Sequence, residues 1–155
     1  MMKAGWAAAA LGLALVASPA HAQTIDATDA KAVQTTLQEA GWQAKLSKSG
    51  DGDPKIEGRI SKSDYQIFFY GCEKNTNCTS LQVSAGWTLK TKPTVEAMND
   101  WNRDKRFASA YLDKDGDPHL QMSINMFGGV TRKNLEDTLD WWRVSITEFE
   151  KTIGW

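Results

Sequence analysis

The sequence predicts an α+β domain in which helices flank an antiparallel sheet. Two hydrophobic periods support this prediction. Apolar and polar residues alternate through 80–87 and 119–126, as in strands that are buried on one face. A period of 3.6 residues runs through 131–149, as in an amphipathic helix. The expected order is one helix, three or four strands, a second helix, two strands and a final helix.

The first half of the chain combines one helix with a run of strands. Residues 26–40 are predicted to be helical, because their apolar residues recur at helical spacing and Gly41 can end the helix. Strands are then expected at 42–47, 55–60, 65–70 and 80–87. The segment from Tyr65 to Tyr70 is largely apolar, so we expect a central strand that is buried on both faces.

The second half predicts a helix, a hairpin and a long final helix. Pro93 lies near the start of a helix that runs to about Arg103. Residues 107–112 and 119–126 should be strands, since an Asp-Gly turn separates them. Thr131 is the expected N-cap of the final helix. The apolar stripe of that helix consists of Leu135, Leu139, Trp142, Ile146 and Phe149.

The first 22 residues have the pattern of a secretory signal peptide. Lys3 precedes an apolar stretch at 7–16, and Ala20-His21-Ala22 is the small-residue motif that signal peptidase accepts. Cleavage after Ala22 would start the mature chain at Gln23. The apolar stretch is shorter than the roughly 20 residues that cross a bilayer, which disfavours an uncleaved anchor. We therefore expect a periplasmic or secreted bacterial protein without a membrane span after processing.

Residues 23–155 are long enough for a single domain with a buried core. The chain has 18 Lys and Arg residues against 19 Asp and Glu residues, so its formal net charge is −1. Nucleic acids and anionic membranes are bound through clustered basic surfaces. Because the basic residues of this chain are scattered, we expect neither of them as a partner.

Cys72 and Cys78 are the two cysteines of the chain. In an exported protein an even number of cysteines indicates disulfide bonding, and the polar residues between these two suit a turn between strands. Such a bridge would stabilise the fold by about 2 kcal/mol through loop closure. A redox pair usually has two intervening residues, and a zinc site needs more ligands than this pair and His119 supply. A structural disulfide is therefore the favoured interpretation.

The motifs of the common catalytic classes are absent from the sequence. It has no Gly-x-Ser-x-Gly, no phosphate-binding glycine loop and no His-Glu-x-x-His, so we predict no catalytic residues, no metal site, no cofactor and no enzyme. Asp113, Asp115 and Asp117 do resemble the start of a calcium loop. An EF-hand requires Gly at the sixth position and Glu at the twelfth, where this chain has Pro118 and Ile124. A hairpin turn explains these aspartates better than a calcium site.

The outward positions of two predicted strands carry uncharged polar side chains. These positions hold Ser80, Gln82 and Ser84 in one strand, and Gln121, Ser123 and Asn125 in the other. Charge depletion is typical of interfaces, so Gln82, Ser84, Gln121 and Ser123 are candidate contacts with another protein chain, including a second copy. Trp141 points about 100° away from Trp142 around the helix and is a further candidate. The alternatives are an ordinary solvated sheet face and a Trp141 partly covered by a loop.

Several segments of the chain resemble YbjN-domain proteins, which are labelled bacterial sensory transduction regulators. The segments are Tyr70-Gly71-Cys72, Ser80-Leu81-Gln82, Trp101-Asn102-Arg103, Arg106-Phe107, Ala110-Tyr111-Leu112-Asp113, Asp115-Gly116-Asp117 and Gly128-Gly129-Val130-Thr131. The resemblance extends from about Gln34 to Phe149. It implies a fold like that of the type III secretion chaperones, which are commonly dimeric, and it brings no catalytic residues or cofactor. The better-known members are cytoplasmic, whereas this chain carries an export signal.

Together these features favour a periplasmic, non-enzymatic protein-interaction domain that is chaperone-like in shape and forms a homodimer. It would bind a segment of a protein partner through a sheet face or a groove. The alternative is a small secreted enzyme inhibitor or envelope-stress factor that acts as a monomer. The oligomeric state of the mature protein separates these two hypotheses.

Overall fold

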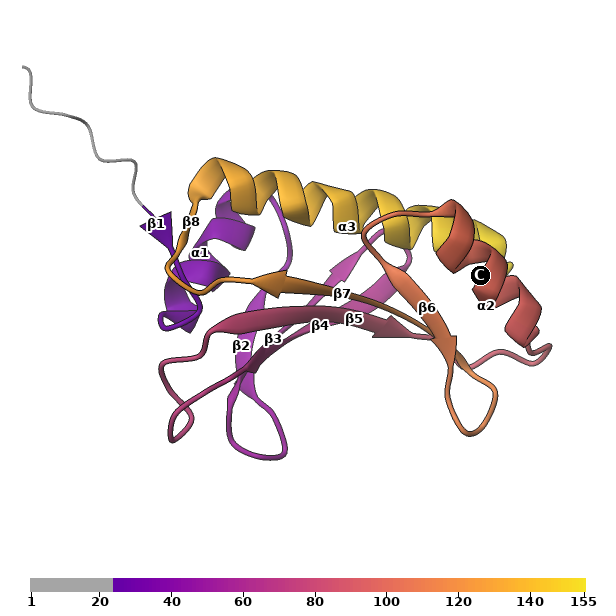
Figure 1. The fold of residues 1–155 in the computed structure, drawn as a ribbon, viewed down its shortest axis with the longest axis horizontal. Coiled ribbons are helices and arrows are strands. Elements are labelled where there is room, and N and C mark those ends of the chain that lie inside the picture. The colour runs from indigo at the N-terminus through magenta and orange to yellow at the C-terminus, as the bar shows by residue number, and fades with distance from the viewer. Residues whose placement is uncertain (1–23) are drawn as a thin grey trace, which may run out of the picture.

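A six-stranded antiparallel sheet forms the centre of the molecule in a computed structural model that describes residues 24–155. The strand order is β2-β3-β4-β5-β7-β6. The helices lie on one side of this sheet, with α3 running along it and α1 and α2 near its two ends (Figure 1). The predicted signal peptide (1–22) and its cleavage site between Ala22 and Gln23 lie outside the described residues.

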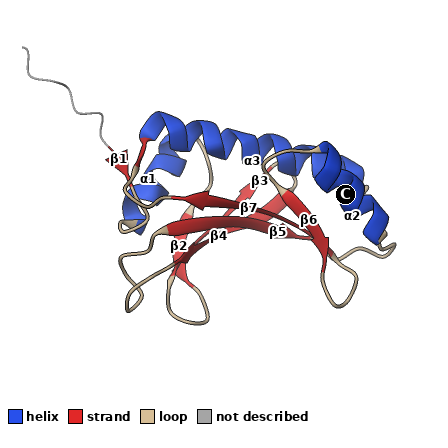
Figure 2. Ribbon diagram, viewed as in Figure 1, coloured by secondary structure: helices blue, strands red, loops and turns tan. Residues whose placement is uncertain are grey.

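The helices and strands follow the predicted order (Figure 2). The helices are α1 (Ala30–Glu39), α2 (Val95–Asp104) and α3 (Arg132–Thr152). The main sheet contains β2 (Lys45–Lys48), β3 (Pro54–Ile60), β4 (Ser63–Tyr70), β5 (Ser80–Gly86), β6 (Ser109–Leu112) and β7 (Pro118–Asn125). Two further strands, β1 (Thr24–Ile25) and β8 (Val130–Thr131), pair with each other. The α+β prediction is confirmed, although β1 and β8 were not predicted, because two residues are too few to show a period.

The hydrophobic core lies between α3 and the sheet. All five residues of the predicted stripe on α3 are buried, as expected: Leu135, Leu139, Trp142, Ile146 and Phe149. They face buried residues that pair across three neighbouring strands, such as Ile67 with Val83 and Val83 with Met122. Burying one such side chain contributes about 1.5–3 kcal/mol. Within residues 24–155, none of the helices is long and apolar enough to cross a membrane.

Helix α3 is fixed at both ends by side-chain hydrogen bonds. At its start the Thr131 hydroxyl accepts a hydrogen bond from the backbone N–H of Asn134 at 3.2 Å, which confirms the predicted N-cap. Near its end the buried carboxylate of Glu150 accepts three hydrogen bonds from the β3–β4 turn. The donors are Ser61 Oγ at 2.6 Å, the backbone N–H of Lys62 at 3.1 Å and Ser63 Oγ at 2.6 Å. The helix is therefore held on the sheet by polar as well as apolar contacts.

Two predicted elements differ from the structure at their starts. The first helix begins at Ala30 rather than at residue 26, because Asp29 is its N-cap and accepts from the N–H of Ala32 at 2.9 Å. The first strand begins at Lys45 rather than at residue 42, since the preceding backbone carbonyls bind side chains instead of a strand. The Ala44 carbonyl, for example, accepts from the amide groups of two glutamines on α1.

The prediction that β4 is buried on both faces was wrong. Ile67 and Phe69 are buried, but Phe68 is half-buried and Tyr70 is exposed. Within the described part of the chain no second layer covers this side of the sheet, and all the helices lie on the other side (Figure 1). The outer side chains of β4 therefore belong to an open face.

The prediction that Phe107 belongs to a strand was also wrong. Phe107 has a φ of 71°, in the left-handed region that a bulky side chain rarely adopts, and β6 begins only at Ser109. Its ring stacks on that of Trp141, with centroids 4.6 Å apart. The chain thus leaves α2 through a strained residue that places an aromatic ring against α3.

Candidate interaction surface

The open face of the sheet brings four of the predicted interface residues together. Strands β5 and β7 are neighbours, and their register pairs Gln82 with Ser123 and Ser84 with Gln121. The amide of Gln82 donates to the Ser123 hydroxyl at 3.5 Å. The four residues form a continuous uncharged patch, as their shared alternation suggested. We call this side of the sheet the open face.

Aromatic side chains complete the open face, and sequence analysis did not assign them to it. Phe68 pairs with Gln82 across β4 and β5, and Tyr70 follows two residues later on the same side. On β6 and β7 the rings of Tyr111 and His119 stack with centroids 5.0 Å apart. Period-2 alternation places each of these residues on a face, but it does not reveal that β4, β5, β7 and β6 are neighbours.

A hollow of about 440 Å³ lies in the open face between these side chains. One glycine shapes it. A Cβ atom at Gly86 would come within 2.5 Å of the His119 ring, so only glycine allows the imidazole to lie against β5. The hollow is lined by amides, hydroxyls, aromatic rings and one carboxylate, that of Asp64, which pairs with Arg59 at 2.9 Å. Such a lining suits neutral polar and aromatic groups of a partner.

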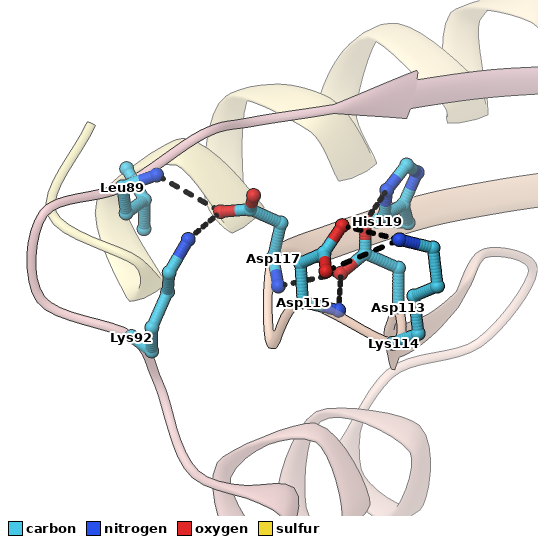
Figure 3. Close-up of polar contacts among 7 residues, drawn as sticks. All are labelled: Leu89, Lys92, Asp113, Lys114, Asp115, Asp117 and His119. Carbon is cyan, nitrogen blue, oxygen red and sulfur yellow. Dashed lines mark hydrogen bonds and ion pairs between the residues drawn. The ribbon is translucent and has the colours of Figure 1, made fainter.

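In the aspartate-rich turn between β6 and β7, the carboxylates of Asp113 and Asp117 accept hydrogen bonds from other groups of the protein (Figure 3). Asp113 Oδ1 accepts from the backbone N–H of Asp115 at 2.9 Å and from that of Asp117 at 2.8 Å. Asp117 accepts from the backbone N–H of Leu89 at 3.1 Å and from the ammonium of Lys92. These contacts close a hairpin turn, as predicted. Among residues 24–155 no three His, Cys, Asp or Glu side chains are grouped to hold a metal ion.

The hydrogen bonds of this turn lower the pKa of two carboxyl groups. The pKa of Asp113 falls below its usual 3.8 chiefly because the N–H of Asp117 donates to it, with further contributions from Asp115 and His119. The pKa of Asp117 falls chiefly because of its hydrogen bond with Lys92. His119 Nε2 lies 3.4 Å from Asp113 Oδ2, so the turn also orients a ring of the open face.

Cys72 and Cys78 form a disulfide in the hairpin between β4 and β5. The hairpin also contacts the turn between β2 and β3. The amide of Asn75 donates to the backbone carbonyl of Asp51 at 3.1 Å and to the carboxylate of Asp53 at 2.8 Å. The disulfide therefore lies in a loop that is anchored on a second loop beside the sheet.

Trp141 does not belong to the open face. It lies on α3, which covers the opposite side of the sheet, and it is 43% exposed. Its ring stacks on Phe107, and the Arg106 guanidinium lies 5.0 Å from the Phe107 ring centroid. Trp141 is thus part of a separate aromatic patch, and it is only partly covered by the segment that follows α2.

Residues 29–155 match the YbjN family, which is described as "Putative bacterial sensory transduction regulator". The chain belongs to the YbjN family. A solved structure is similar, "Crystal structure of YbjN, a putative transcription regulator from E. coli", with a TM-score of 0.50 and 14% sequence identity. The similarity covers 81% of this chain and 93% of that chain. No curated protein sequence matches the chain.

The YbjN match covers the whole main sheet and all three helices, since it begins at the N-cap of α1. The resemblance that the sequence suggested is therefore confirmed. The family description is that of a regulator and not of an enzyme. At 14% identity the likeness to the E. coli structure is a likeness of fold, so the properties of the open face have to be argued from this chain itself.

Proposed function

We propose that this chain is an exported, non-enzymatic protein-interaction domain that binds a protein surface through its open face and forms a homodimer there. One observation carries the proposal. The centre of the open face is uncharged and partly aromatic, although it is not covered by any described part of the chain.

The composition of the open face agrees with that of protein interfaces. Interfaces are depleted of Lys, Glu and Asp and enriched in aromatic residues, relative to the rest of a protein surface. The central strands β4, β5 and β7 provide Gln82, Ser84, Gln121 and Ser123 together with Phe68. Charged residues lie nearer the margin, where Lys55 pairs with Glu57 on β3 at 2.6 Å and Asp64, near the start of β4, pairs with Arg59 at 2.9 Å. An uncharged centre with a charged margin is the arrangement of a typical interface.

Two features support export. The disulfide between Cys72 and Cys78 needs an oxidising compartment to form and persist. The N-terminal sequence has the order of charge, apolar stretch and Ala-x-Ala that signal peptidase reads. A regulatory role in the periplasm agrees with the description of the family, and it would operate through contacts with other proteins rather than through DNA.

A pair of charges introduced into the open face tests the proposal. In Gln82→Glu/Gln121→Glu, two like charges lie on adjacent strands at the centre of the face, where burial in an interface would be costly. We expect the wild-type protein to have twice the mass of one chain in light scattering and the variant to be monomeric. Asn134→Glu/Thr152→Glu adds the same charge to exposed positions on α3, and it should remain a dimer.

Equal masses for the wild-type protein and the open-face variant would overturn a homodimer that forms through the open face. If the wild-type protein is itself monomeric, the monomeric inhibitor or stress factor becomes the better hypothesis. The open face as a protein-binding surface would be abandoned if the variant also retained every partner that the wild-type protein binds.

A further inference from the structure

The two edge strands of the main sheet differ in whether their outward backbone groups have hydrogen-bond partners. Strand β6 forms one edge and β2 forms the other (Figure 1). Helix α2 covers the β6 edge with side chains that replace a neighbouring strand. The Asn102 amide donates to the Ala110 carbonyl at 2.9 Å and accepts from the Ala110 N–H at 2.7 Å, while the Trp101 indole donates to the Ala108 carbonyl at 3.1 Å. The β6 edge therefore has no room for another strand.

Strand β2 presents free backbone groups at the other edge. The hairpin of β2 and β3 is closed by a hydrogen bond from the Ser49 N–H to the Asp53 carbonyl at 2.8 Å. Backbone groups point to alternate sides along a strand, so Lys45 and Ser47 face β3, and Leu46 and Lys48 face outward. The pairing of Lys48 with Pro54, which has no N–H, agrees with this direction. None of the residues 24–155 forms a hydrogen bond with the outward groups of Leu46 and Lys48.

The surface beside this edge is hollowed and positively charged. A hollow of about 350 Å³ extends along β2, between Ala30 of α1 and the disulfide hairpin. The ionisable side chains that line it are Lys48 and Lys74. Lys45 adds a third ammonium at the start of the strand, where it lies opposite Glu57 of β3. Neither Lys48 nor Lys74 forms an ion pair with another described residue. The β2 edge thus combines free backbone donors and acceptors with the positive charge of Lys48 and Lys74.

We propose that the β2 edge binds an extended acidic segment of a protein partner, which adds to the sheet as a seventh, antiparallel strand. Main-chain hydrogen bonds to Leu46 and Lys48 would provide the affinity, and charge would provide the selectivity. The favoured segment has the pattern acidic, any, apolar, acidic, so that its acidic residues lie opposite Lys48 and Lys45 and its apolar residue opposite Leu46. Leu46 is 38% exposed and pairs with the buried Ile56, so this apolar contact extends the core.

The same charges argue against a second copy of the chain at this edge. Pairing two β2 strands through their outward residues would bring the Lys48 side chains of both copies onto the same face of the sheet, and directly opposite each other in the register that pairs Lys48 with Lys48. Like charges directly opposite each other destabilise a strand pair. Lysines on an edge strand commonly prevent such self-pairing, while they remain compatible with an acidic partner.

The test is an NMR titration of the ¹⁵N-labelled protein with two probe peptides. The acidic probe is acetyl-Thr-Glu-Thr-Val-Glu-Thr-amide, and the control replaces both Glu residues by Lys. We expect the acidic probe to shift the amide signals of Leu46 and Lys48 in a saturable manner at about 1 mM peptide. The basic probe should bind about tenfold more weakly, because two charge pairs change from attraction to repulsion.

Two variants separate the backbone contacts from the charges. Leu46→Pro removes an outward N–H without removing a hydrogen bond to β3, so the acidic probe should no longer shift the signals of β2. Lys45→Glu/Lys48→Glu leaves the backbone unchanged and should reverse the preference between the two probes. This second variant keeps the test decisive if the proline variant does not fold.

Three results of the peptide titrations would overturn the proposal: no localised shift with the acidic probe, equal binding of both probes, or unchanged binding by Leu46→Pro. Shifts of β2 signals that depend on protein concentration without peptide would show self-pairing instead, and would also overturn it. The proposal takes from the proposed function only that the partner is a protein. Gln82→Glu/Gln121→Glu should leave the titration unchanged, and Leu46→Pro should leave the mass unchanged, so the two surfaces can fail separately.

Discussion

At the scale of single residues, Glu150 is the most consequential polar group of the core. It is 3% exposed, and its hydrogen-bond donors are two hydroxyls and a backbone N–H rather than a cation. Ser63 also accepts a hydrogen bond from the indole of Trp87 at 2.7 Å. Glu150 is therefore one member of a buried chain of hydrogen bonds that joins α3, the β3–β4 turn and the segment after β5.

Replacement of Glu150 should destabilise the protein in proportion to the hydrogen bonds that are lost. We expect Glu150→Ala to lower the free energy of unfolding by about 2–4 kcal/mol, since it leaves buried donors without an acceptor. Glu150→Gln keeps one acceptor oxygen and should cost about half as much. Urea unfolding monitored by circular dichroism measures both values. A loss below about 0.5 kcal/mol for the alanine variant would contradict this role.

Asp113 should make stability depend on pH in the acidic range. Its folded pKa lies below 3.8, chiefly because of the hydrogen bond from the Asp117 N–H. The ionised form is therefore favoured by folding. This contribution is fully present above the unfolded pKa and is lost as the pH falls through the lower, folded pKa.

The variant Asp113→Asn removes this titration. The difference in unfolding free energy between the wild-type protein and the variant should be largest near neutral pH and should shrink as the pH is lowered below 3.8. Urea unfolding at a series of pH values measures this difference. Asp115→Asn is the control, since among residues 24–155 the Asp115 carboxylate forms hydrogen bonds and an ion pair with the exposed Lys114 alone, at 2.9 Å. A difference that is constant with pH would refute the assignment.

At the scale of elements, the cover of the β6 edge depends on one amide side chain. Asn102→Leu removes both hydrogen bonds to Ala110 and should cost about 1–3 kcal/mol, because polar backbone groups lose their partner. Asn102→Asp keeps an acceptor for the Ala110 N–H but loses the donor to its carbonyl, and should have an intermediate effect. Unfolding measurements rank the three proteins, and a leucine variant as stable as the wild-type protein would show that the cover is dispensable.

The periods of the sequence predicted most elements because most are buried on one side. For this reason the apolar stripe of α3 and the alternation of apolar and polar residues in β5 and β7 gave correct predictions. Position 107 was assigned wrongly, since Phe has a strong strand preference but has a left-handed φ here, where its ring stacks on Trp141. The aromatic part of the open face was missed because it depends on strand order. Gly86 and His119 pair across 33 positions of sequence, and no local pattern reports such a pairing.

At the scale of the whole molecule, the open face and the β2 edge are separate surfaces on one sheet. The open face is the side of the sheet opposite α3 (Figure 1). The β2 edge instead offers backbone groups in the plane of the sheet. A partner on one surface therefore does not need to displace a partner on the other, and a domain with two such surfaces can bring two proteins together.

The position of α3 in the chain also affects how this protein reaches its folded state. Every strand of the sheet precedes α3 in the sequence, yet α3 supplies the other half of the core. When the N-terminal part of the chain emerges first, strands β2 to β7 are complete while their apolar faces are still in contact with water. Such surfaces aggregate readily, so a newly emerged chain needs protection until residues 132–152 have followed. Without this last segment the apolar face of the sheet would have no α3 to pack against, even if both binding surfaces were intact.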